Sequence, residues 1–560
     1  MAAALQPVSP FAAHTAVDAW PALLLAALIA TPVLWVALSA IGSALDAAAW
    51  QALWSEPQLP RALALSLWTG LAATALSAAV AAWLLSISFP GRGWRALVRV
   101  LPPMLAVPHA AFAIGLAFLI APSGWILRLF SPWATGFAAP PPWPTVQDPW
   151  GLGLIAVLVF KEVPFLLWAA ATQLQRADTA ARWEAELQLA LSMGYSPRTA
   201  WWQVVWPQLW PMLVAPLAAV LAYSLTVVDM ALAIGPVSPP TLAVLAWQWL
   251  LDADASVNAT GAAAGWLLAG VLALVAAVLW LAQRLLRQRR PRVNGRRGHS
   301  MPVGWRRSWP AIAVAATYGA VLAALAVGSV SGVWPFPKLW PDNLSLQAWQ
   351  SVASSSSTLQ VTVALAAASS LAALAWSVAW LECAPPAWDR SLRRLVYLPL
   401  LLPSVLWVVG LHRVGLAWGI DAHWTGLWLA HSLAAAPYVL IALSPAYLGF
   451  DPRYRQLTAS LGSTRLSYLL RVKWPLLKAS LWAGAAVGFA VSVAQYLPTL
   501  FVGAGRYATV TTEAVTLASG GQRSLTAAYA WLQALLPALA FAIAAWAGRP
   551  RRFRDRTVSQ

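Results

Sequence analysis

Charge is scarce in this sequence. Only 10% of its 560 residues are Asp, Glu, Lys or Arg, whereas an ordinary soluble domain carries about 25%. Hydrophobic residues make up 60%, and the mean hydropathy is +0.66. A soluble chain of this size could not bury so much apolar surface, so the composition excludes a soluble globular protein and predicts a chain embedded in lipid.

The residues that usually build catalytic and metal sites are also rare. The single Cys383 excludes an intramolecular disulfide and a cysteine metal site. The six His form no His-Glu-x-x-His pattern. A phosphate-binding loop needs Gly directly before Lys, and no lysine meets this requirement (Lys161, Lys338, Lys473 and Lys478). We therefore expect no cofactor, no metal and no enzyme active site in this chain.

Long apolar runs are abundant instead. Each is roughly 20 residues long, the length of an α-helix that crosses a hydrocarbon core about 30 Å thick. They predict an all-α integral membrane protein with about 12 transmembrane helices, at 20–43, 61–86, 101–121, 151–173, 207–231, 259–286, 310–332, 358–381, 395–416, 425–448, 475–499 and 525–547.

The net charge of +18 raises the possibility of nucleic-acid binding. The distribution of the basic residues favours another interpretation, because most of them fall on one side of the predicted spans when both termini are placed in the cytosol. This bias follows the positive-inside rule and predicts contact with anionic lipid, not with nucleic acid. The exceptions are Lys161, within a span, and six residues on the outer side: Arg61, Arg128, Lys338, Arg413, Arg506 and Arg523.

A basic, apolar-poor segment divides the chain into two similar halves. We predict a first membrane domain over 1–283, a cytosolic linker over 284–308, a second membrane domain over 309–548 and a basic tail over 549–560. An even number of spans before the linker gives both halves the same orientation. Matching pairs of residues support the repeat: Pro108 and Gly115 with Pro403 and Gly410, and Pro164 with Pro437.

The most specific repeat is a loop after spans four and ten. It reads QLALSMGYSPRTAWWQVVWP at 188–207 and QLTASLGSTRLSYLLRVKWP at 456–475, which share Gln-Leu-x4-Gly-x9-Val-x-Trp-Pro without a gap. Helix-favouring residues precede Gly194, which we expect to end the helix in a left-handed conformation. A second short helix should follow, with Ser196 as its cap in the first copy. In the second copy Gly462 is the stop, and Ser463 or Thr464 is the cap.

This predicted helix–turn–helix elbow places apolar residues on a cytosolic surface, and such a surface usually marks a partner site. The alternative is a solvated connector between spans, but chance does not place Gly and Pro identically twice.

The loop resembles the cytosolic "EAA" loop of binding-protein-dependent ABC importer permeases, whose pattern is Glu-Ala-Ala-x3-Gly-x9-Ile-x-Leu-Pro. Gln replaces Glu, and Trp replaces Leu. The resemblance implies that the matching residues couple the chain to an ATPase. These residues are Gln188, Ala190, Gly194, Val204 and Pro207 in the first copy and Gln456, Gly462, Val472 and Pro475 in the second.

Residues 20–547 are also similar to the fused permeases of ferric-iron and thiamine importers, most of all to a thiamine-like subgroup. The resemblance implies two tandem six-helix permease domains of the type I importer kind in a bacterial inner membrane, with both termini cytosolic. It implies that a separate homodimer of ATPase subunits hydrolyses ATP and that a periplasmic protein delivers the solute. The solute stays open among thiamine, ferric iron, a polyamine or another small molecule or ion.

Ionisable residues inside spans are costly and usually face an internal path or a partner. We expect Lys161 and Glu162 in span four, Asp229 near the end of span five, and Gln495 in span eleven to be candidates for the translocation pathway; for the first two, a structural role is equally open. We expect His431 in span ten to be an interior histidine with satisfied hydrogen bonds.

A twelve-span secondary transporter driven by an ion gradient is the alternative function, because such folds also contain repeated halves. A major-facilitator-type protein would favour an acidic residue in the loop after span two, and here the loop reads Gly91-Arg92-Gly93-Trp94-Arg95. It would also have no reason for paired elbows.

Overall fold

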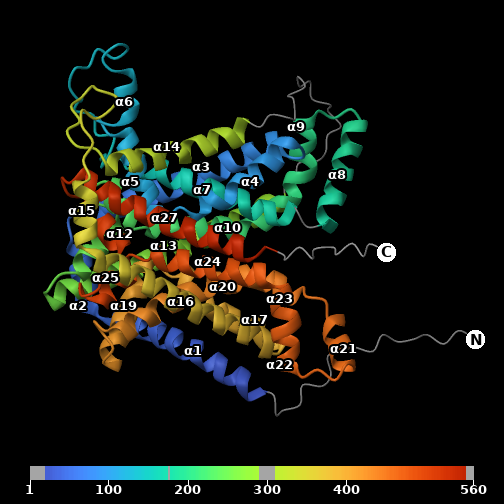
Figure 1. Cartoon of the computed structure of the whole chain (residues 1–560). Coiled ribbons are helices and arrows are strands. Elements are labelled where there is room, and N and C mark those ends of the chain that lie inside the picture. Colours follow the sequence, from blue (N-terminus) through green and yellow to red (C-terminus); the bar gives the residue numbers. More distant parts are fainter. Residues whose placement is uncertain (1–18, 175–176, 289–308, 550–560) are drawn as a thin grey trace, which may run out of the picture.

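The computed structural model describes residues 19–174, 177–288 and 309–549. Over these ranges the chain is helical, apart from one isolated antiparallel bridge between Ser331 and Leu344 (Figure 1). Ten of the described helices are long and apolar enough to cross a membrane, or up to 12 if each of two bent helix pairs is one span. The predicted fold class is therefore confirmed.

The long helices and the repeated loops follow the same order in both halves, although the halves differ in their short helices. The first half consists of α1 (Ala19–Gly42), a 3-10 turn η2 (Ser43–Leu45), α2 (Ala47–Ser55), α3 (Leu59–Ser88), α4 (Arg92–Ala106), α5 (His109–Ile120), α6 (Trp125–Phe130), α7 (Leu152–Leu174), α8 (Ala177–Ser192), α9 (Pro197–Ala200), a π-helical turn η3 (Trp201–Val205), α10 (Trp206–Thr226), α11 (Asp229–Ile234), α12 (Leu242–Leu250) and α13 (Ala255–Gln288).

The second half consists of α14 (Trp309–Ser329), α15 (Gln347–Ser354), α16 (Ser356–Cys383), α17 (Pro386–Val396), α18 (Leu398–Leu401), α19 (Ser404–Trp418), α20 (Trp424–Leu448), α21 (Arg453–Ser460), α22 (Arg465–Tyr468), a π-helical turn η4 (Leu469–Lys473), α23 (Trp474–Leu476), α24 (Lys478–Ala494), α25 (Leu497–Gly503), α26 (Val510–Ala518) and α27 (Arg523–Ala547).

Equivalent hydrogen bonds support the repeat. The Ser66 hydroxyl of α3 accepts from the backbone N–H of Leu242 at 2.8 Å, where α12 begins. The Thr362 hydroxyl of α16 accepts from the backbone N–H of Val510 at 2.9 Å, where α26 begins. In each half, a buried hydroxyl of the second span thus satisfies a free N–H group in the first turn of a short helix.

Several predicted spans are interrupted in the structure. The span predicted at 101–121 breaks between α4 and α5, at Pro108. The span predicted at 395–416 bends by 108° between 386–401 and 404–418, next to Pro403. Proline has no N–H group to continue the helical hydrogen bonds and disfavours helical geometry in the preceding residue, which explains both breaks. The spans predicted at 207–231 and 475–499 are also interrupted, after Thr226 and after Ala494.

The predicted linker begins within a helix. Helix α13 continues through Gln288, so the first residues of the predicted linker 284–308 are helical. Residues 289–308 and 550–560 lie outside the described residues.

The first helix of each half packs against the other half. Helix α1 lies against α16, α17 and α19, and the Trp376 indole donates to the Leu25 carbonyl at 2.9 Å. Helix α14 lies against α4 and α5 of the first half as well as against α27 of its own half, and the Tyr318 hydroxyl donates to the Phe160 carbonyl at 3.1 Å. The two halves are therefore interlocked, not merely adjacent.

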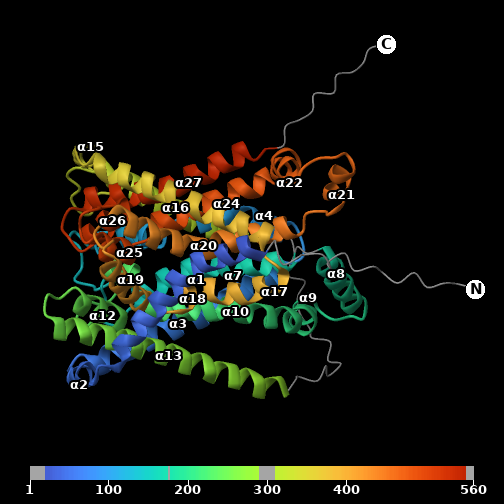
Figure 2. The ribbon, with the colours of Figure 1, turned by 90° about the horizontal axis from the view of Figure 1, so that it is seen from below.

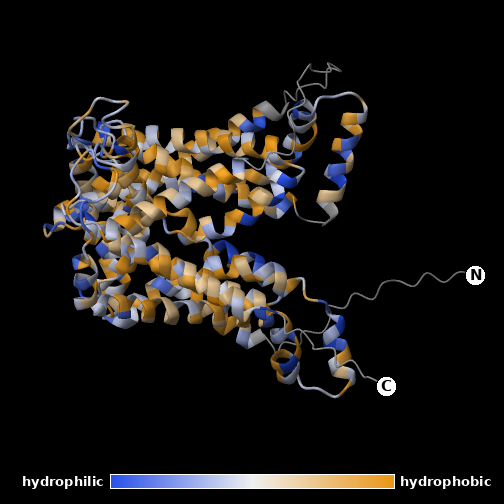
Figure 3. Cartoon of the chain, turned by 45° about the horizontal axis from the view of Figure 1, so that its top comes forward, coloured by the Kyte–Doolittle hydropathy of each residue, from blue (hydrophilic) through white to orange (hydrophobic). Residues whose placement is uncertain are grey.

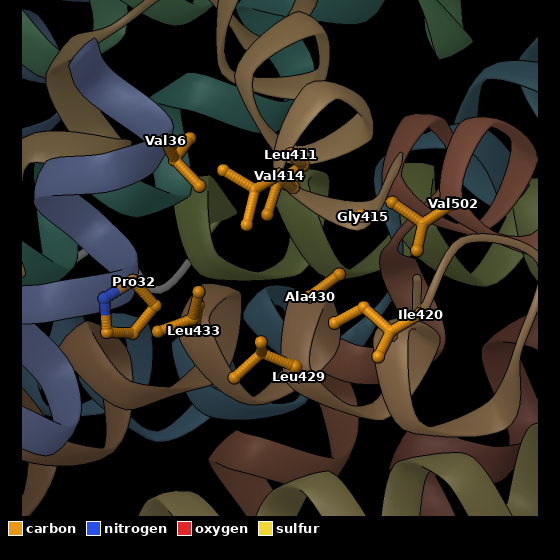
Figure 4. Close-up of a pocket in the computed structure, with 11 residues that line it drawn as sticks. Pro32, Val36, Leu411, Val414, Gly415, Ile420, Leu429, Ala430, Leu433 and Val502 are labelled. Atoms are coloured by element: carbon orange, nitrogen blue, oxygen red, sulfur yellow. The ribbon is translucent and has the colours of Figure 1, made fainter. Parts of the chain in front are cut away.

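The contact of α1 with the second half is close-packed. Pro32 and Val36 of α1 face Leu411 and Val414 of α19 across an apolar gap of about 10 Å³ (Figure 4). A gap of this size holds at most one water molecule, so it is a packing defect and not a solute site.

The two ends of the molecule differ. Hydrophobic residues predominate in the long helices, and hydrophilic residues gather in the loops of one end and in the helices α8 and α21 at the other (Figure 3). Helices α8 and α9 and their counterparts α21 and α22 lie at the same end but apart from each other (Figures 1 and 2). The fold thus presents the two repeated loops as separate projections on one face.

Candidate functional site

The first repeated loop folds as the predicted elbow, which we define as residues 177–205. Helix α8 ends near Gly194, whose φ is +84°. The N–H of Tyr195 bonds the carbonyl of Ala190 at 3.1 Å, as in a Schellman C-cap. The Ser196 hydroxyl then accepts from the N–H of Thr199 at 3.2 Å and caps α9.

The second elbow, residues 453–473, repeats this geometry. Helix α21 ends before Gly462, whose φ is +75°, and the N–H of Ser463 bonds the carbonyl of Thr458 at 3.0 Å. Thr464 caps α22 by accepting from the N–H of Ser467 at 3.3 Å. Of the two predicted caps, Thr464 is the one used. The predicted stop and cap are therefore confirmed in both copies.

Each elbow continues into its span through a π-helical turn that the sequence analysis missed. Turn η3 holds Val204 and precedes Pro207; turn η4 holds Val472 and precedes Pro475. Proline offers no N–H to the carbonyl four residues earlier, which is a sequence signal for a widened turn at this place. Both valines are half-buried, so they anchor the turns and do not form the outer surface.

The outer surface of each elbow carries an equivalent pair of exposed apolar side chains. Leu189 and Met193 of the first elbow are 62% and 55% exposed, and Leu457 and Leu461 of the second are 60% and 76% exposed. Leu189 and Leu457 lie in the last turns of α8 and α21, and Met193 and Leu461 directly follow these helices, so the two pairs occupy equivalent places. The polar candidates Gln188 and Gln456 are also exposed, while Ala190 is buried.

The two elbows are attached to the membrane domain by different contacts. In the first elbow, Trp183, Leu187 and Ala190 are buried. Gln208 of α10 forms hydrogen bonds with several side chains of α8. Its amide oxygen accepts from Arg182 at 2.6 Å and from the Trp183 indole at 3.0 Å, and its amide nitrogen donates to Glu186 at 2.7 Å. Helix α8 is thus held both by apolar packing and by these hydrogen bonds to Gln208.

The second elbow is held by a carboxylate. Glu382, near the end of α16, accepts from the Lys473 ammonium at 2.7 Å and from the Tyr447 hydroxyl at 3.0 Å. The Arg465 guanidinium donates to the Glu382 backbone carbonyl at 2.9 Å. Helix α21 has no buried residue of its own, so the second elbow is held through α22 and η4, by this ionic cluster and by the buried side chains of Tyr468 and Leu469.

Lys161, a predicted pathway residue, lies at the break between α4 and α5. Its ammonium donates to the carbonyl of Val107 at 2.7 Å and to that of Met104 at 3.4 Å, and it faces the rings of Phe112 and Tyr318. Carbonyl groups left free at a helix break inside a membrane need a partner. Lys161 supplies it, and its side chain is 3% exposed.

Glu162 and Asp229 belong to a central polar cluster, which also contains His109, Tyr223 and Tyr438. The Glu162 carboxylate lies 3.8 Å from the His109 imidazole, and the His109 and Tyr223 rings are 4.8 Å apart. The Tyr223 phenol lies within electrostatic range of the Asp229 carboxylate. Tyr438, from the other half, is 43% exposed and lies within electrostatic range of Glu162. Two carboxyl groups, an imidazole and two phenols can hold a cation or a polar solute.

Gln495 remains within its own half, donating to the Val491 carbonyl at 3.2 Å. Its neighbour Tyr496 approaches the first half, where its ring lies 6.5 Å from the ring of Trp247 in α12. The sequence analysis missed His109 and Tyr438, although each directly follows a proline of a matched pair, Pro108 or Pro437.

His431 is 1% exposed and has both ring nitrogens within 2.9 Å of a hydroxyl, from Ser492 and from Thr499. The prediction of a satisfied interior histidine is confirmed. Among the described residues, no group of three His, Cys, Asp or Glu side chains could hold a metal ion.

A comparison with known protein families finds no match. Individual proteins are similar. The inner membrane ABC transporter permease protein YnjC of Escherichia coli K12 is 34% identical over 536 residues, which cover 94% of this chain and 96% of that protein. A protein of Haloferax volcanii named a probable molybdenum ABC transporter permease is 29% identical over 152 residues, 25% of this chain and 56% of that protein. The sulfate transport system permease protein CysT of Salmonella typhimurium is 31% identical over 79 residues, 14% of this chain and 28% of that protein. The chain belongs to the ABC transporter permeases.

Proposed function

We propose that this chain supplies both permease domains of one ABC importer in a bacterial inner membrane and that two ATPase subunits, as a homodimer, bind its two elbows. The observation that carries the proposal is the equivalence of the exposed pairs, Leu189 with Met193 and Leu457 with Leu461. Apolar side chains exposed at equivalent places on two projections of one face suit two copies of the same partner groove.

The elbows also suit force transmission. Each is a short helix joined to a span through a capped turn, so movement of the helix is passed to the span. On this proposal ATP binding draws the ATPase subunits together, the elbows follow, and the halves move between inward- and outward-facing states. The chain itself then hydrolyses no ATP and holds no cofactor. Helix α1 begins at the elbow end (Figure 1), in agreement with a cytosolic N-terminus.

The solute path runs, on the same proposal, between the halves past the central polar cluster. Glu162 and Asp229 are carboxyl groups of this cluster, and carboxyl groups inside a membrane domain favour a cation. An organic cation such as thiamine, delivered by a periplasmic binding protein, fits this chemistry. Gln495 and Lys161 would act beside the path by fixing the interrupted spans.

The deciding experiment is reconstitution of the chain into vesicles with its ATPase and its solute-binding protein. We expect solute uptake that needs ATP on the elbow side and both partner proteins, and competition by thiamine or by ferric iron identifies the solute. Uptake driven by a proton or sodium gradient, without nucleotide and without a second protein, would overturn the proposal in favour of a secondary transporter.

A further inference from the structure

A cavity of about 750 Å³ opens at the end of the molecule opposite the elbows. Helices α5 and α6 of the first half form one wall. The end of α14, the loop that follows it, α15 and the first turn of α27 form the others. Both halves therefore build this outer cavity, and it is large enough for a small organic molecule.

The lining of the outer cavity is polar and positively charged. It includes several serine hydroxyls, the side-chain amides of Asn and Gln residues, and the guanidinium groups of Arg128 and Arg523. No Asp or Glu is among the described residues that line it. Both arginines belong to the six basic residues that the sequence predicts on the outer side, against the general bias of basic residues toward the cytosol.

Arg128 is a fixed charge in the wall of the cavity. Only 5% exposed, it donates to the backbone carbonyls of Ser123, Trp334, Pro335 and Lys338 at 2.7–3.0 Å. These bonds hold α6 against the loop of the second half. Carbonyl dipoles and aromatic rings solvate the guanidinium, but no carboxylate of the described chain pairs with it.

Arg523 brings a second charge to the same place. Its Nη1 group donates to the Ser123 hydroxyl at 2.7 Å, while the Ser123 carbonyl accepts from Arg128. The two guanidinium groups repel each other across this serine. Arg523 is exposed, has no carboxylate partner within the described residues, and starts the 25-residue helix α27, whose N-terminal dipole adds positive potential. The two positive charges thus face one cavity without a counter-ion.

We propose that the outer cavity is an oxyanion site that binds a phosphate or carboxylate group. Arg523 binds the anion through its free N–H groups, and Arg128 contributes charge without leaving its carbonyl partners. Charge-assisted bonds from a guanidinium to these groups are short and strong. The anion relieves the repulsion between the arginines and links the two halves at the outer face.

The test measures equilibrium binding of radiolabelled inorganic phosphate to the purified full chain in detergent. Citrate serves as a competitor, and chloride keeps the ionic strength constant. We expect saturable phosphate binding that citrate displaces, and a rise of about 2 °C in the melting temperature at saturation. Arg523→Gln should weaken phosphate binding about tenfold or more, as the loss of a charged hydrogen bond predicts.

Arg413→Gln is the matched control, because Arg413 is another outer arginine that bonds a backbone carbonyl, that of Ser39 at 3.1 Å, but does not line the cavity. It should bind phosphate as the unmodified chain does. Absence of saturable binding in the unmodified chain, or equal weakening in both variants, would overturn the proposal. Nanodiscs distinguish a lipid headgroup from a soluble anion as the natural ligand. If the chain binds phosphate in phosphatidylcholine nanodiscs but not in phosphatidylglycerol nanodiscs, the natural anion is a lipid headgroup. If it binds phosphate in both, the natural anion is soluble.

Discussion

The exposed apolar pair of the second elbow permits a quantitative prediction. Leu457 and Leu461 are 60% and 76% exposed, and full burial of a leucine side chain is worth about 1.5–3 kcal/mol. Covering the exposed part of both in an ATPase groove should therefore contribute about 2–4 kcal/mol to binding. This corresponds to a change in Kd of about 30-fold to several hundredfold.

Replacing both leucines by serine removes this contribution and leaves the fold of the permease unchanged, since exposed substitutions usually alter stability by about 0.5 kcal/mol or less. The assay is the affinity of the purified ATPase for nanodiscs that contain the permease, measured beside ATP-driven uptake. We expect both to fall, while the melting temperature of the permease stays constant.

The matched control replaces Leu344 and Leu346 by serine. These leucines are 74% and 63% exposed but lie in the loop after α14, at the opposite end of the molecule. This variant should bind the ATPase normally. If the elbow variant binds the ATPase as tightly as the control does, the elbows do not seat in the ATPase, and the reasoning fails.

Three further predictions concern the turn, the anchor and the path. Gly462→Val forces a β-branched residue into a left-handed conformation at a cost of about 1–2 kcal/mol, although its Cβ would meet nothing within 4 Å. The ATPase activity coupled to transport should therefore fall in this variant, whereas Gly462→Asn should keep near-normal activity. Equal activity in the two variants would contradict the role of the turn. Glu382→Gln leaves the Lys473 ammonium without its counter-charge, so thermal unfolding should occur at a lower temperature and ATP-driven uptake should decrease; unchanged values would show that the carboxylate does not hold the elbow. Asp229→Asn and Lys161→Met should each alter solute uptake while membrane insertion, measured by protease protection, stays normal; uptake unchanged in both variants would remove these residues from the pathway.

The elbows could be predicted from sequence because local interactions build them. The stop at Gly194 and the cap at Ser196 depend on hydrogen bonds between residues no more than five apart. The same residues at the same spacing therefore give the same turn in the second copy. The number and approximate position of the spans follow for a similar reason, because each helix must by itself satisfy its backbone and cover its length with apolar side chains.

The central cluster and the anchors of the elbows could be predicted only in part. The sequence indicates Glu162 and Asp229, because they are ionisable residues in apolar surroundings. It does not indicate their partners His109 and Tyr223, because only the packing of α5, α7, α10 and α11 brings the four residues together. Nothing near Glu382 in the sequence indicates its bond to Lys473, 91 residues later.

The sequence by itself determined the membrane class, the duplication and the repeated elbow, since composition, hydrophobic run length and short-range spacing are properties of the chain alone. Only the tertiary structure decided that α1 and α14 each contact the other half, that Lys161 satisfies the carbonyl groups of a broken span, and that Arg128 and Arg523 face one cavity. Each of these arrangements joins residues that are distant in sequence, and which distant residues meet depends on how the apolar faces of all the helices pack together.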